Sequence, residues 1–503
     1  MERSLYQEIC QGNRLRENLT ALRQEIRDEG KRKRLAYEIG GDFTVFTGLL
    51  ENEDPKVRKS AALILGEMEC PDLVTPLYEA YEKEETLFVR SSYLKALAAY
   101  DCRELFAKLR ERLAWLDRQQ TLPEEEKHRR EEAAALQKLL LGQEKQKKHR
   151  FTGFEERVEV ILLTNRCQRD VTAALVEEKE AAERMALLAG GVRVLTSRLA
   201  RLWEIRTWSE MLFTVPGMRY VSMEPKEAAA ALAVPVQRLL NRLHEGKFPY
   251  RFRLDIRGRK RGAEEASKKG DLIRRLAAAI EMESKRELVN APSEYELEIR
   301  LLETKNGQWV PLLKLFTLAD RRFLYRSQVV ATSIAPYNAA LIMELARDWL
   351  KPHAQVLDPF CGVGTMLVER ARLMPADPLY GVDIYEEAIQ KARENAELAG
   401  LPIHYINRDI RDFTHEYLFD EVISDMPGTG KTRDKGQILE LYESFLNRIP
   451  VLLKKNGVLV LYTGEPDILK WCMEAHSGLF PEKEVELNEK NGSSLFVIRY
   501  TGE

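Results

Sequence analysis

The sequence predicts a multidomain protein with an α-helical N-terminal region, a central α+β region and a C-terminal doubly wound α/β domain. A helical pattern repeats near the N-terminus, short strands and a basic stretch follow, and strands alternate with helices from residue 338 onward. Because 503 residues exceed the size at which one core stops growing, we expect several domains. Their predicted ranges are 1–116, 117–150, 151–330 and 331–503.

The composition favours a water-soluble protein and leaves its partners open. Lys and Arg number 78 against 80 Asp and Glu, which gives a net charge of −2, and 44% of the residues are hydrophobic. No apolar run approaches the roughly 20 residues that span a bilayer, and the polar start does not resemble a secretory signal. The six cysteines are far apart and form no CxxC pair. We expect a cytoplasmic protein without membrane or metal partners.

A weak internal repeat organises residues 1–116. The stretch DPKVRKSAALILGEM (54–68) is echoed 32 residues later by TLFVRSSYLKALAAY (86–100). This period of helix–turn–helix units is similar to HEAT repeats, which stack helix pairs into a solenoid. An ordinary helical bundle is the alternative. Such arrays usually bind something, so the repeats are a candidate surface for a protein partner.

Residues 117–150 are dominated by Glu, Lys, Arg, Gln, Ala and Leu. This composition predicts a solvated helix or a charged helical linker.

The central region, 151–330, mixes short strands with helices. The β-branched run at 158–164 predicts a strand, and the pattern at 195–212 predicts a helix. Two apolar runs flank Asn306-Gly307, a dipeptide that favours a β-hairpin.

A basic stretch lies inside this central region. Residues 251–269 hold eight basic side chains against three acidic ones, and the alternation at 252–258 predicts a strand with a basic face. Basic residues on a strand and loop can follow a phosphate backbone, although a merely solvated face is the alternative. The candidate RNA-binding residues are Arg251, Arg253, Arg257, Arg259, Lys260 and Arg261.

The C-terminal region, 331–503, predicts a Rossmann-like doubly wound sheet whose ligand crevice lies at the carboxyl ends of its strands. Five strands are expected at 355–357, 379–382, 403–406, 421–424 and 457–462. Helices are expected at 339–350, from 366, at 387–399 and at 439–453. A closing antiparallel hairpin is expected from 485–487 and 494–500.

Motifs follow the first two of these strands. VLDPFCGVGT (356–365) leaves the first strand, and its glycines, Gly362 and Gly364, allow a sharp turn and a close approach to a ligand. Asp358 could accept hydrogen bonds from an ammonium group of that ligand. The second strand ends at Asp383, where a carboxylate can hold both ribose hydroxyls.

Two further motifs follow the third and fourth strands. Asp409 is placed to accept from an adenine amino group, with Ile410 beside the ring, and SDMPGTGKT (424–432) follows the fourth strand. One acidic residue after a strand is often only a helix cap. Four in this order predict a site for S-adenosylmethionine.

DPFCGVGT (358–365) resembles the DPxCGxGT signature of an RNA methylase family that includes the THUMP-containing methyltransferases of tRNA and rRNA guanine N2. The resemblance is specific for the last 170 residues and implies a class I methyltransferase fold. More loosely, 314–346 resembles the join between THUMP and catalytic domains, and 202–213 the ferredoxin-like segment that precedes THUMP. These likenesses imply that 151–330 is a ferredoxin-like, THUMP-like RNA-binding region. The expected cofactor-binding residues are Asp358, Pro359, Gly362, Gly364, Thr365, Asp383, Ile384, Asp409, Ile410, Ser333 and Asn338.

The fourth motif carries the predicted catalytic residues, Asp425, Met426 and Pro427. Related amino-methyltransferases place an aromatic residue after the proline, where this chain has Gly428. A phosphate-binding P-loop is the other interpretation of GTGKT, but that motif needs glycine where Asp425 stands.

The sequence therefore predicts an S-adenosylmethionine-dependent RNA methyltransferase that acts on an exocyclic base amine, guanine N2 of tRNA or rRNA. Two alternatives stay open. One is a DNA or protein methyltransferase, against which the basic stretch argues. The other is a catalytically degenerate methylase-fold scaffold that binds RNA or protein, which Gly428 favours.

Overall fold

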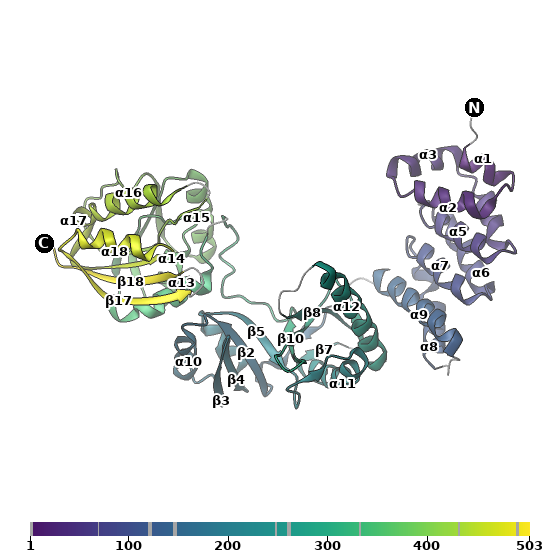
Figure 1. The fold of residues 1–503 in the computed structure, drawn as a ribbon, viewed down its shortest axis with the longest axis horizontal. Helices are drawn as coiled ribbons and strands as arrows, with labels where there is room; N and C mark the ends of the chain where they lie inside the picture. The colour runs from purple at the N-terminus through teal and green to yellow at the C-terminus, as the bar shows by residue number, and fades with distance from the viewer. Residues whose placement is uncertain are drawn as a thin grey trace. The chain divides into compact units, whose positions relative to one another are not determined.

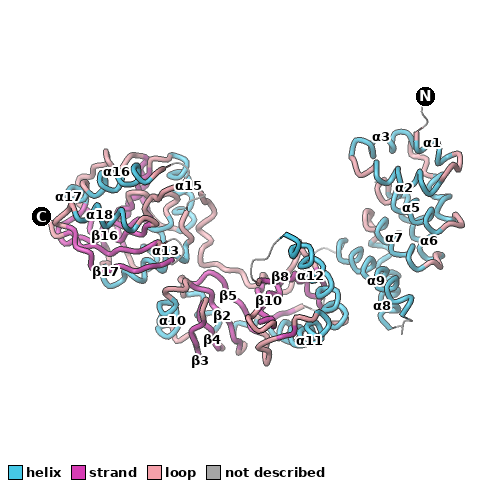
Figure 2. Tube along the Cα trace, in the orientation of Figure 1, coloured by secondary structure: helices cyan, strands magenta, loops and turns pink. Residues whose placement is uncertain are grey.

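The structure is a computed structural model in two compact units, Met1–Lys148 and His149–Glu503. It describes residues 4–68, 70–118, 123–143, 148–246, 249–258, 263–330, 333–430, 433–488 and 492–502. Figures 1 and 2 show the helices of the first unit and the two large sheets of the second.

The described part of the first unit is helical. Its buried core is built from aliphatic and aromatic side chains that recur along the helices, as amphipathic helices require. The helices are α1 (Leu5–Cys10), α2 (Leu15–Glu25), α3 (Glu29–Ile39), α4 (Thr44–Gly48), α5 (Pro55–Leu65), α6 (Val74–Lys83), α7 (Leu87–Leu97), α8 (Phe106–Arg118) and α9 (Pro123–Gln143), with 3-10 turns η1 (Leu49–Glu51), η2 (Pro71–Leu73) and η3 (Arg103–Leu105).

The two copies of the predicted repeat form α5 and α7, which pack against each other. Helix α5 begins where the sequence indicates, because the Asp54 side chain accepts a hydrogen bond from the Lys56 amide and Pro55 opens the first turn. The helix pairs agree with helical repeats, and the HEAT assignment itself stays a prediction.

Helix α9 differs from the expected solvated linker at 117–150. It packs against α7 and α8, and its Leu136 and Leu139 are buried in the core of the helical unit. Glu132 is also buried, where it accepts hydrogen bonds from Tyr81, Arg90 and Arg112. The average composition of 117–150 did not reveal this burial, because the apolar residues of α9 are concentrated in its second half and follow a highly charged first half.

The central region of the second unit is built on a mixed sheet in the order β3-β4-β2-β5-β11-β10-β8-β9, with β6 pairing β11. The strands are β2 (Val158–Thr164), β3 (Arg184–Leu188), β4 (Gly191–Thr196), β5 (Trp208–Thr214), β6 (Val221–Ser222), β8 (Tyr250–Arg257), β9 (Leu288–Asn290), β10 (Leu297–Glu303) and β11 (Gln308–Leu315). The helices are α10 (Arg169–Glu178), α11 (Pro225–Leu243) and α12 (Ala263–Glu283), and β1 (Arg150–Phe151) pairs β7 (His244–Glu245) apart from the sheet.

Three expectations for this region are confirmed and one is wrong. The strand expected at 252–258 is β8. The strand at 158–164 is β2, and the hairpin at Asn306-Gly307 joins β10 to β11, with Gly307 at φ +69°. The helix expected at 195–212 does not form. That segment ends β4, makes the 3-10 turn η5 (Leu199–Glu204) and enters β5, because pairing with β2 outweighs its helical pattern.

The C-terminal domain has the sheet order β14-β13-β12-β15-β16-β18-β17. Its first five strands run parallel, and β18 inserts antiparallel between β16 and β17. The strands are β12 (Ala354–Asp358), β13 (Ala376–Asp383), β14 (Ile403–Asn407), β15 (Phe419–Asp425), β16 (Leu453–Thr463), β17 (Leu479–Asn488) and β18 (Ser493–Tyr500). This confirms the predicted doubly wound α/β fold.

Helices cover both faces of this sheet, so it has two cores (Figure 1). One core involves α13 (Pro336–Ala346), α14 (Thr365–Leu373) and α15 (Glu386–Ala399), and the other α16 (Lys435–Leu446), α17 (Ile449–Leu452) and α18 (Pro466–Glu474). The single helix expected at 439–453 is divided in two, with Pro450 in the first turn of α17.

Within the residues that the structure describes, no helix is both long and apolar enough to cross a bilayer. The same residues contain no cluster of three or more His, Cys, Asp or Glu side chains that could hold a metal ion.

Candidate active site

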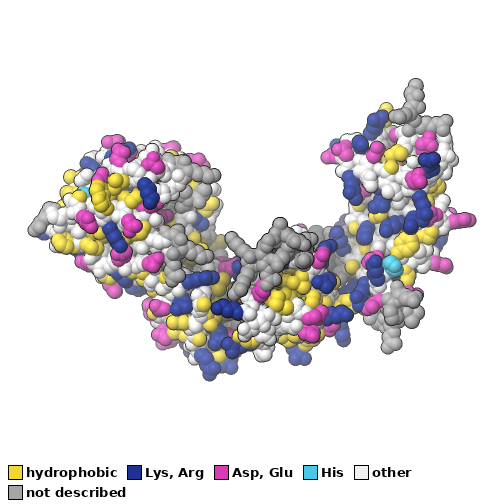
Figure 3. Space-filling view, viewed as in Figure 1, with side chains coloured by type: hydrophobic (Ala, Val, Ile, Leu, Met, Phe, Trp, Pro, Cys, Tyr) yellow, Lys and Arg dark blue, Asp and Glu magenta, His cyan; other side chains and the backbone are white. Residues whose placement is uncertain are grey.

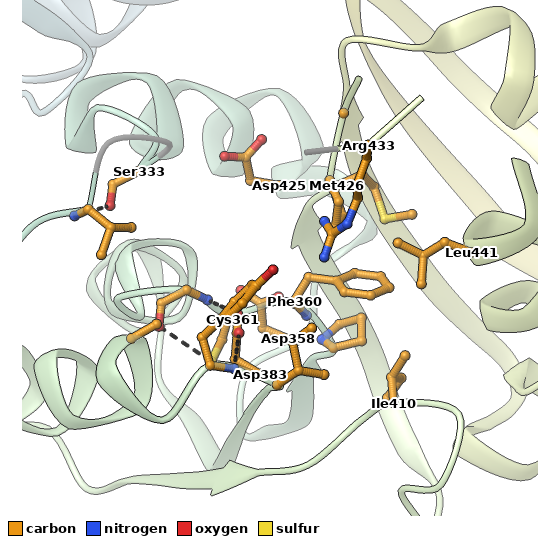
Figure 4. Close-up of a pocket in the computed structure, with 18 of the residues that line it drawn as sticks. Ser333, Asp358, Phe360, Cys361, Asp383, Ile410, Asp425, Met426, Arg433 and Leu441 are labelled. Atoms are coloured by element: carbon orange, nitrogen blue, oxygen red, sulfur yellow. Dashed lines mark hydrogen bonds between the residues drawn. The ribbon is translucent and has the colours of Figure 1, made fainter. Parts of the chain in front are cut away.

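A cavity of about 800 Å³ lies at the carboxyl ends of β12, β13, β14 and β15. The acidic residues that follow the four strands, Asp358, Asp383, Asp409 and Asp425, all line it. Figure 4 shows several of the lining side chains gathered around this space. Of the other predicted residues, it is lined by Pro359, Gly362, Thr365, Ile384, Ile410, Ser333, Met426 and Pro427.

The turn between β12 and α14 forms the floor. Gly362 and Gly364 have φ values of +51° and +81°, a backbone region that L side chains rarely adopt. Gly364 is the N-cap of α14 and is not among the residues that line the cavity. A Cβ on Gly364 would overlap the Tyr405 side chain. The role of Gly364 is to shape the turn that the cavity needs.

Asp358 is the most deeply placed carboxyl group. Its Oδ1 accepts hydrogen bonds from the Ser424 hydroxyl at 2.8 Å and the Phe360 amide at 3.2 Å. Its Oδ2 is buried and has no hydrogen-bond partner within the described residues. Burial, with smaller contributions from the Asp425 and Asp383 charges, raises the pKa of Asp358 to about 8. A cationic group in the cavity would give this carboxyl a partner.

Asp383 links the end of β13 to the glycine turn. Its Oδ2 accepts from the Gly362 amide at 2.9 Å and its Oδ1 from the Tyr385 amide at 3.0 Å. Because each carboxylate oxygen has two lone pairs, both oxygens can still accept from a vicinal diol. The neighbouring Ile384 is half exposed and adds an apolar wall.

Asp409 is held in place by Arg411. The Arg411 guanidinium donates to both carboxylate oxygens, with Nη2 2.6 Å from Oδ2, and its amide donates to Oδ1. This pairing lowers the pKa of Asp409. The carboxylate is therefore ionised and positioned, with Ile410 buried beside it.

The loop after β15 carries Asp425, Met426 and Pro427. The Met426 amide donates to the Tyr462 carbonyl at 2.8 Å, and the Tyr442 hydroxyl donates to the Pro427 carbonyl at 2.7 Å, so the loop is fixed on both sides. Among the described residues, no group donates a hydrogen bond to the Asp425 carboxyl. Burial raises the pKa of Asp425 to about 7. This carboxyl is free to meet a substrate.

Ser333 and Asn338 have different outcomes. Ser333 lines the cavity, and its hydroxyl accepts from the Val330 amide at 3.0 Å. Asn338 lies in the first turn of α13 and is not among the lining residues, so its predicted contact with a cofactor is not supported. The family pattern that suggested it covers a whole segment, and only the start of that segment reaches the cavity.

The sequence interpretation missed one wall of the cavity. Arg433 and the first half of α16 supply it, and Phe360 lies near Arg433 in Figure 4. The missed α16 residues are Gln437, Glu440 and Leu441. A signal was present, because Asp434 and Gln437 form a capping box that marks a helix start at Lys435. The apolar periodicity placed that start four residues later.

The predicted basic face on β8 is only partly available. Arg251 is buried at 8% exposed, and Arg253 donates to the buried Glu298, so these two are not free to follow a phosphate backbone. β8 is an interior strand, between β10 and β9, so its residues have neighbouring strands on both sides. Arg257 is exposed and pairs with Asp255. Arg259, Lys260 and Arg261 lie outside the described residues.

Exposed cations of the central region are also found away from β8. Figure 3 shows Lys and Arg side chains over β3 and β4, and Arg184 and Arg193 are exposed on those strands. An anionic partner of this region could therefore contact the arginines of β3 and β4 as well as the predicted basic stretch.

Residues 324–491 match the family model described as an RMKL-like, methyltransferase domain. A tRNA (guanine(6)-N2)-methyltransferase of Thermus thermophilus is 32% identical over 157 residues, or 31% of this chain and 46% of the relative. The "Probable tRNA (guanine(10)-N2)-dimethyltransferase" of Methanothermococcus thermolithotrophicus is 30% identical over 131 residues, or 24% of this chain and 76% of the relative. The match thus spans about half the length of the Thermus relative and three quarters of the second.

A third relative has an RNA of another kind in its name. The U6 snRNA (guanine-N(2))-methyltransferase THUMPD2 of Mus musculus is 30% identical over 173 residues, 34% of this chain and 30% of that relative. Among solved structures, TrmN from Thermus thermophilus has a TM-score of 0.52 at 19% identity, over 68% of this chain and 99% of that one. SMU.472 complexed with SAH has a TM-score of 0.50 at 14% identity, over 69% and 98%. These two structures share the fold of a large part of the chain.

Proposed function

Since this chain belongs to the RMKL-like methyltransferase family through its C-terminal domain, we propose that it uses S-adenosylmethionine to methylate the exocyclic N2 amine of guanine in RNA. The observation that carries the proposal is the convergence of Asp358, Asp383, Asp409 and Asp425 on one cavity. Four relatives named for guanine-N2 methylation of tRNA, together with the relative named for U6 snRNA, support the substrate class.

The residues of the cavity fit S-adenosylmethionine. The unpartnered Asp358 Oδ2 suits the ammonium group of the methionine part. Asp383 can accept from both ribose hydroxyls, and Asp409 with Ile410 can meet the edge and face of adenine. The volume of about 800 Å³ lies within the range of small-molecule sites and also leaves room for a target base.

When bound, S-adenosylmethionine supplies an electrophilic methyl group on a sulfonium. The exocyclic amine of guanine is a weak nucleophile because its lone pair is delocalised into the ring. The Asp425 carboxylate and the Met426 carbonyl can accept from its two N–H groups, which localises the lone pair and aims it. Alignment of this kind contributes up to about 7–11 kcal/mol in favourable cases.

The Asp425 carboxyl also suits the proton that must leave. As the N–CH₃ bond forms and the S–CH₃ bond breaks, the amine nitrogen gains positive charge and then loses one proton. A carboxyl with a pKa of about 7 can accept that proton near neutral pH. A target guanine inside a helix would first have to be flipped out of its stack.

The missing aromatic residue defines the second candidate, a non-catalytic methylase-fold scaffold. A Cβ on Gly428 would meet no atom of the described residues within 4 Å, so the position where relatives carry an aromatic ring is open space. In Figure 4 the Arg433 guanidinium points into the cavity near the Phe360 ring, and no ion pair holds it among the described residues. A guanidinium plane can stack on a base, and this favours the enzyme over the scaffold.

The upstream regions extend the proposal. The central region, 151–330, is proposed as a THUMP-like RNA-binding arm, on its resemblance and its exposed arginines. The helices of Met1–Lys148 are proposed as HEAT-like repeats for a protein partner, on the packed repeat pair α5 and α7. A cytoplasmic location follows from substrates of the tRNA class.

The experiment is a comparison of Asp425→Ala with wild type. Calorimetry should give S-adenosylmethionine affinities within about twofold, because Asp425 faces the substrate side. Transfer of labelled methyl into total RNA should fall at least about 100-fold, the size expected when a group that acts on the reacting amine is removed. Parallel DNA and protein fractions test the other substrate classes. Turnover equal to wild type would contradict a catalytic role for Asp425. Label in DNA or protein instead of RNA would contradict the assignment of RNA as the substrate.

A further inference from the structure

A second cavity, of about 890 Å³, lies in the unit His149–Glu503 and shares no lining residue with the active site. Five arginines line it, namely Arg150, Arg206, Arg321, Arg322 and Arg372. No aspartate or glutamate is among its described lining residues. We name it the arginine cleft. Its composition indicates a site for an anion.

Two of the arginines build the cleft wall. Arg206 donates to both oxygens of the buried Glu369, at 2.7 and 2.8 Å. Arg322 donates to Asp320 and to two backbone carbonyls, and its guanidinium lies 3.1 Å from the centre of the Trp208 ring. Arg322 is buried and Arg206 is partly buried, and both have hydrogen-bond partners, so they fix the wall and leave little charge for a ligand.

The other three arginines are exposed at the rim. Arg372 donates to the Ala399 carbonyl at 2.6 Å and has no ion pair among the described residues. Arg321 likewise has no ion pair there. Arg150 pairs with Glu245, but both side chains are mostly exposed, at 75% and 62%, so the pair is weak and can be exchanged. The rim therefore keeps positive charge for an anionic ligand.

Aromatic side chains lie beside these cations. Phe154 is 40% exposed, and its ring packs edge-on against Phe151 at 5.0 Å. Trp203 is half-buried against Trp208, with 5.1 Å between the rings. A supported, exposed ring next to free guanidinium groups is the combination that binds single-stranded nucleic acid, because it offers a face for a base and charge for its phosphates.

We propose that the arginine cleft binds a single-stranded segment of the substrate RNA, with phosphates at Arg321 and Arg372 and an unstacked base on Phe154. The inference rests on the proposed function for the identity of the polymer. The cleft is lined by the central region at Phe154 and by the catalytic domain at Arg372, which lies in α14. RNA held there would be anchored at a point separate from the reacting guanine.

The test measures binding of a fluorescein-labelled single-stranded RNA hexamer to the full chain by anisotropy, without S-adenosylmethionine. The variants are the double variant Arg321→Glu/Arg372→Glu and Phe154→Ala. The matched control is Arg238→Glu, an exposed arginine on α11 that does not line the cleft. Calorimetry with S-adenosylmethionine checks that each variant retains an intact active site.

The double variant should weaken hexamer binding at least tenfold and lower the slope of log affinity against log salt by about 1 to 2. Phe154→Ala should weaken it about tenfold with an unchanged slope, since stacking carries no charge. The control should change neither. Equal hexamer affinity and slope in the double variant, the control and wild type would overturn the proposal.

Two further arms separate the sources of the anion. Inorganic phosphate and GMP should compete with the hexamer only at concentrations far above its dissociation constant. Either one binding as tightly as the hexamer would overturn the RNA assignment in favour of a free anion. Hexamer binding is measured without methyl transfer, so the two proposals can fail separately. Loss of the methyltransferase proposal would appear as absent methyl transfer with hexamer binding still dependent on the cleft. Loss of the cleft proposal would appear as methyl transfer with hexamer binding unchanged in the cleft variants.

Discussion

At the residue scale, the site depends on carboxyl groups whose surroundings differ. Asp409 is held ionised by Arg411, whereas Asp358 and Asp425 have raised pKa values because they are buried. A raised pKa favours the neutral carboxyl in the protein without ligand. A cation in the cavity would restore the ionised form, so the two buried carboxyl groups are placed to pair with a positively charged ligand.

Asp358 gives the first prediction at this scale. Below its ordinary pKa of 3.8 the carboxyl is neutral in both the folded and unfolded chain. As pH rises from about 4 to 8, only the unfolded chain ionises, so folding stability falls, and the loss is complete above about 8. Asp358→Asn cannot ionise and retains an acceptor for Ser424. At pH 9 its free energy of unfolding should therefore exceed that of wild type by on the order of a few kcal/mol, which raises its unfolding temperature. Near pH 4 the two proteins should unfold at the same temperature.

Thermal unfolding of the ligand-free chain at pH 4.5, 7 and 9 checks this. The same variant should bind S-adenosylmethionine at least tenfold more weakly, because the charged partner of the ammonium group is gone. A variant that is destabilised equally at every pH would show that Asp358 serves the fold alone.

Arg433 gives the second prediction. Arg433→Ala should raise the KM for RNA about tenfold, the size of one lost base-stacking contact, and leave S-adenosylmethionine affinity unchanged. Arg433→Lys should not restore it, because an ammonium group has no plane to stack. Lys435→Ala is the control, since Lys435 is exposed on α16 and does not line the cavity. Equal KM values for the Arg433 variants and the control would contradict the proposal that Arg433 stacks on the target base.

At the element scale, strand ends and helix starts carry the site, and these are the features that the sequence predicts best. The strands β12, β13, β14 and β15 were each expected within a few residues, because each holds a short apolar run with an acidic residue at its end or within two residues after it. Glycines at positive φ mark the turn after β12. Local patterns of this kind depend little on the rest of the fold.

What the sequence did not reveal depends on distant packing. Whether 195–212 is helical or runs into a strand is decided by pairing of β5 with β2, about 50 residues earlier in the chain. The burial of Arg251 and the pairing of Arg253 follow from β8 lying inside a sheet whose neighbours come later in the sequence. The cavity wall on α16 likewise appears only when the helix packs beside β15.

Helix α9 gives the prediction at this scale. Glu132 is buried, with hydrogen bonds from Tyr81, Arg90 and Arg112 that hold its pKa below its usual range despite the opposing effect of burial. Glu132→Ala would remove the carboxylate partner of Arg90 and Arg112 and should lower the free energy of unfolding by about 3–5 kcal/mol. The lowered pKa means that this contribution is present above the ordinary carboxyl pKa and is lost as the pH falls through the folded value.

Denaturant unfolding followed by circular dichroism measures this, with Glu131→Ala as the exposed control on the same helix. Glu132→Gln retains an acceptor and should lose less. A solvated linker would instead give the same small effect for Glu131→Ala and Glu132→Ala.

At the scale of the whole molecule, each unit has its own hydrophobic core, and the catalytic domain shares its unit with the central sheet. Within that unit the buried Glu369 of α14 accepts from both Arg206 and Tyr325, which ties the catalytic domain to the segments before it. This arrangement suits a large anionic polymer that contacts an arm and a catalytic cavity together.

The most direct test of guanine-N2 methylation is nucleoside mass spectrometry after reaction in vitro. The purified chain is incubated with S-adenosylmethionine carrying a deuterated methyl group and with total RNA from cells that lack the protein. We predict deuterated N2-methylguanosine in tRNA or rRNA with wild type and none with Asp425→Ala. RNA that carries no deuterated methyl group, or carries it only on a nucleoside other than guanosine, would contradict the account.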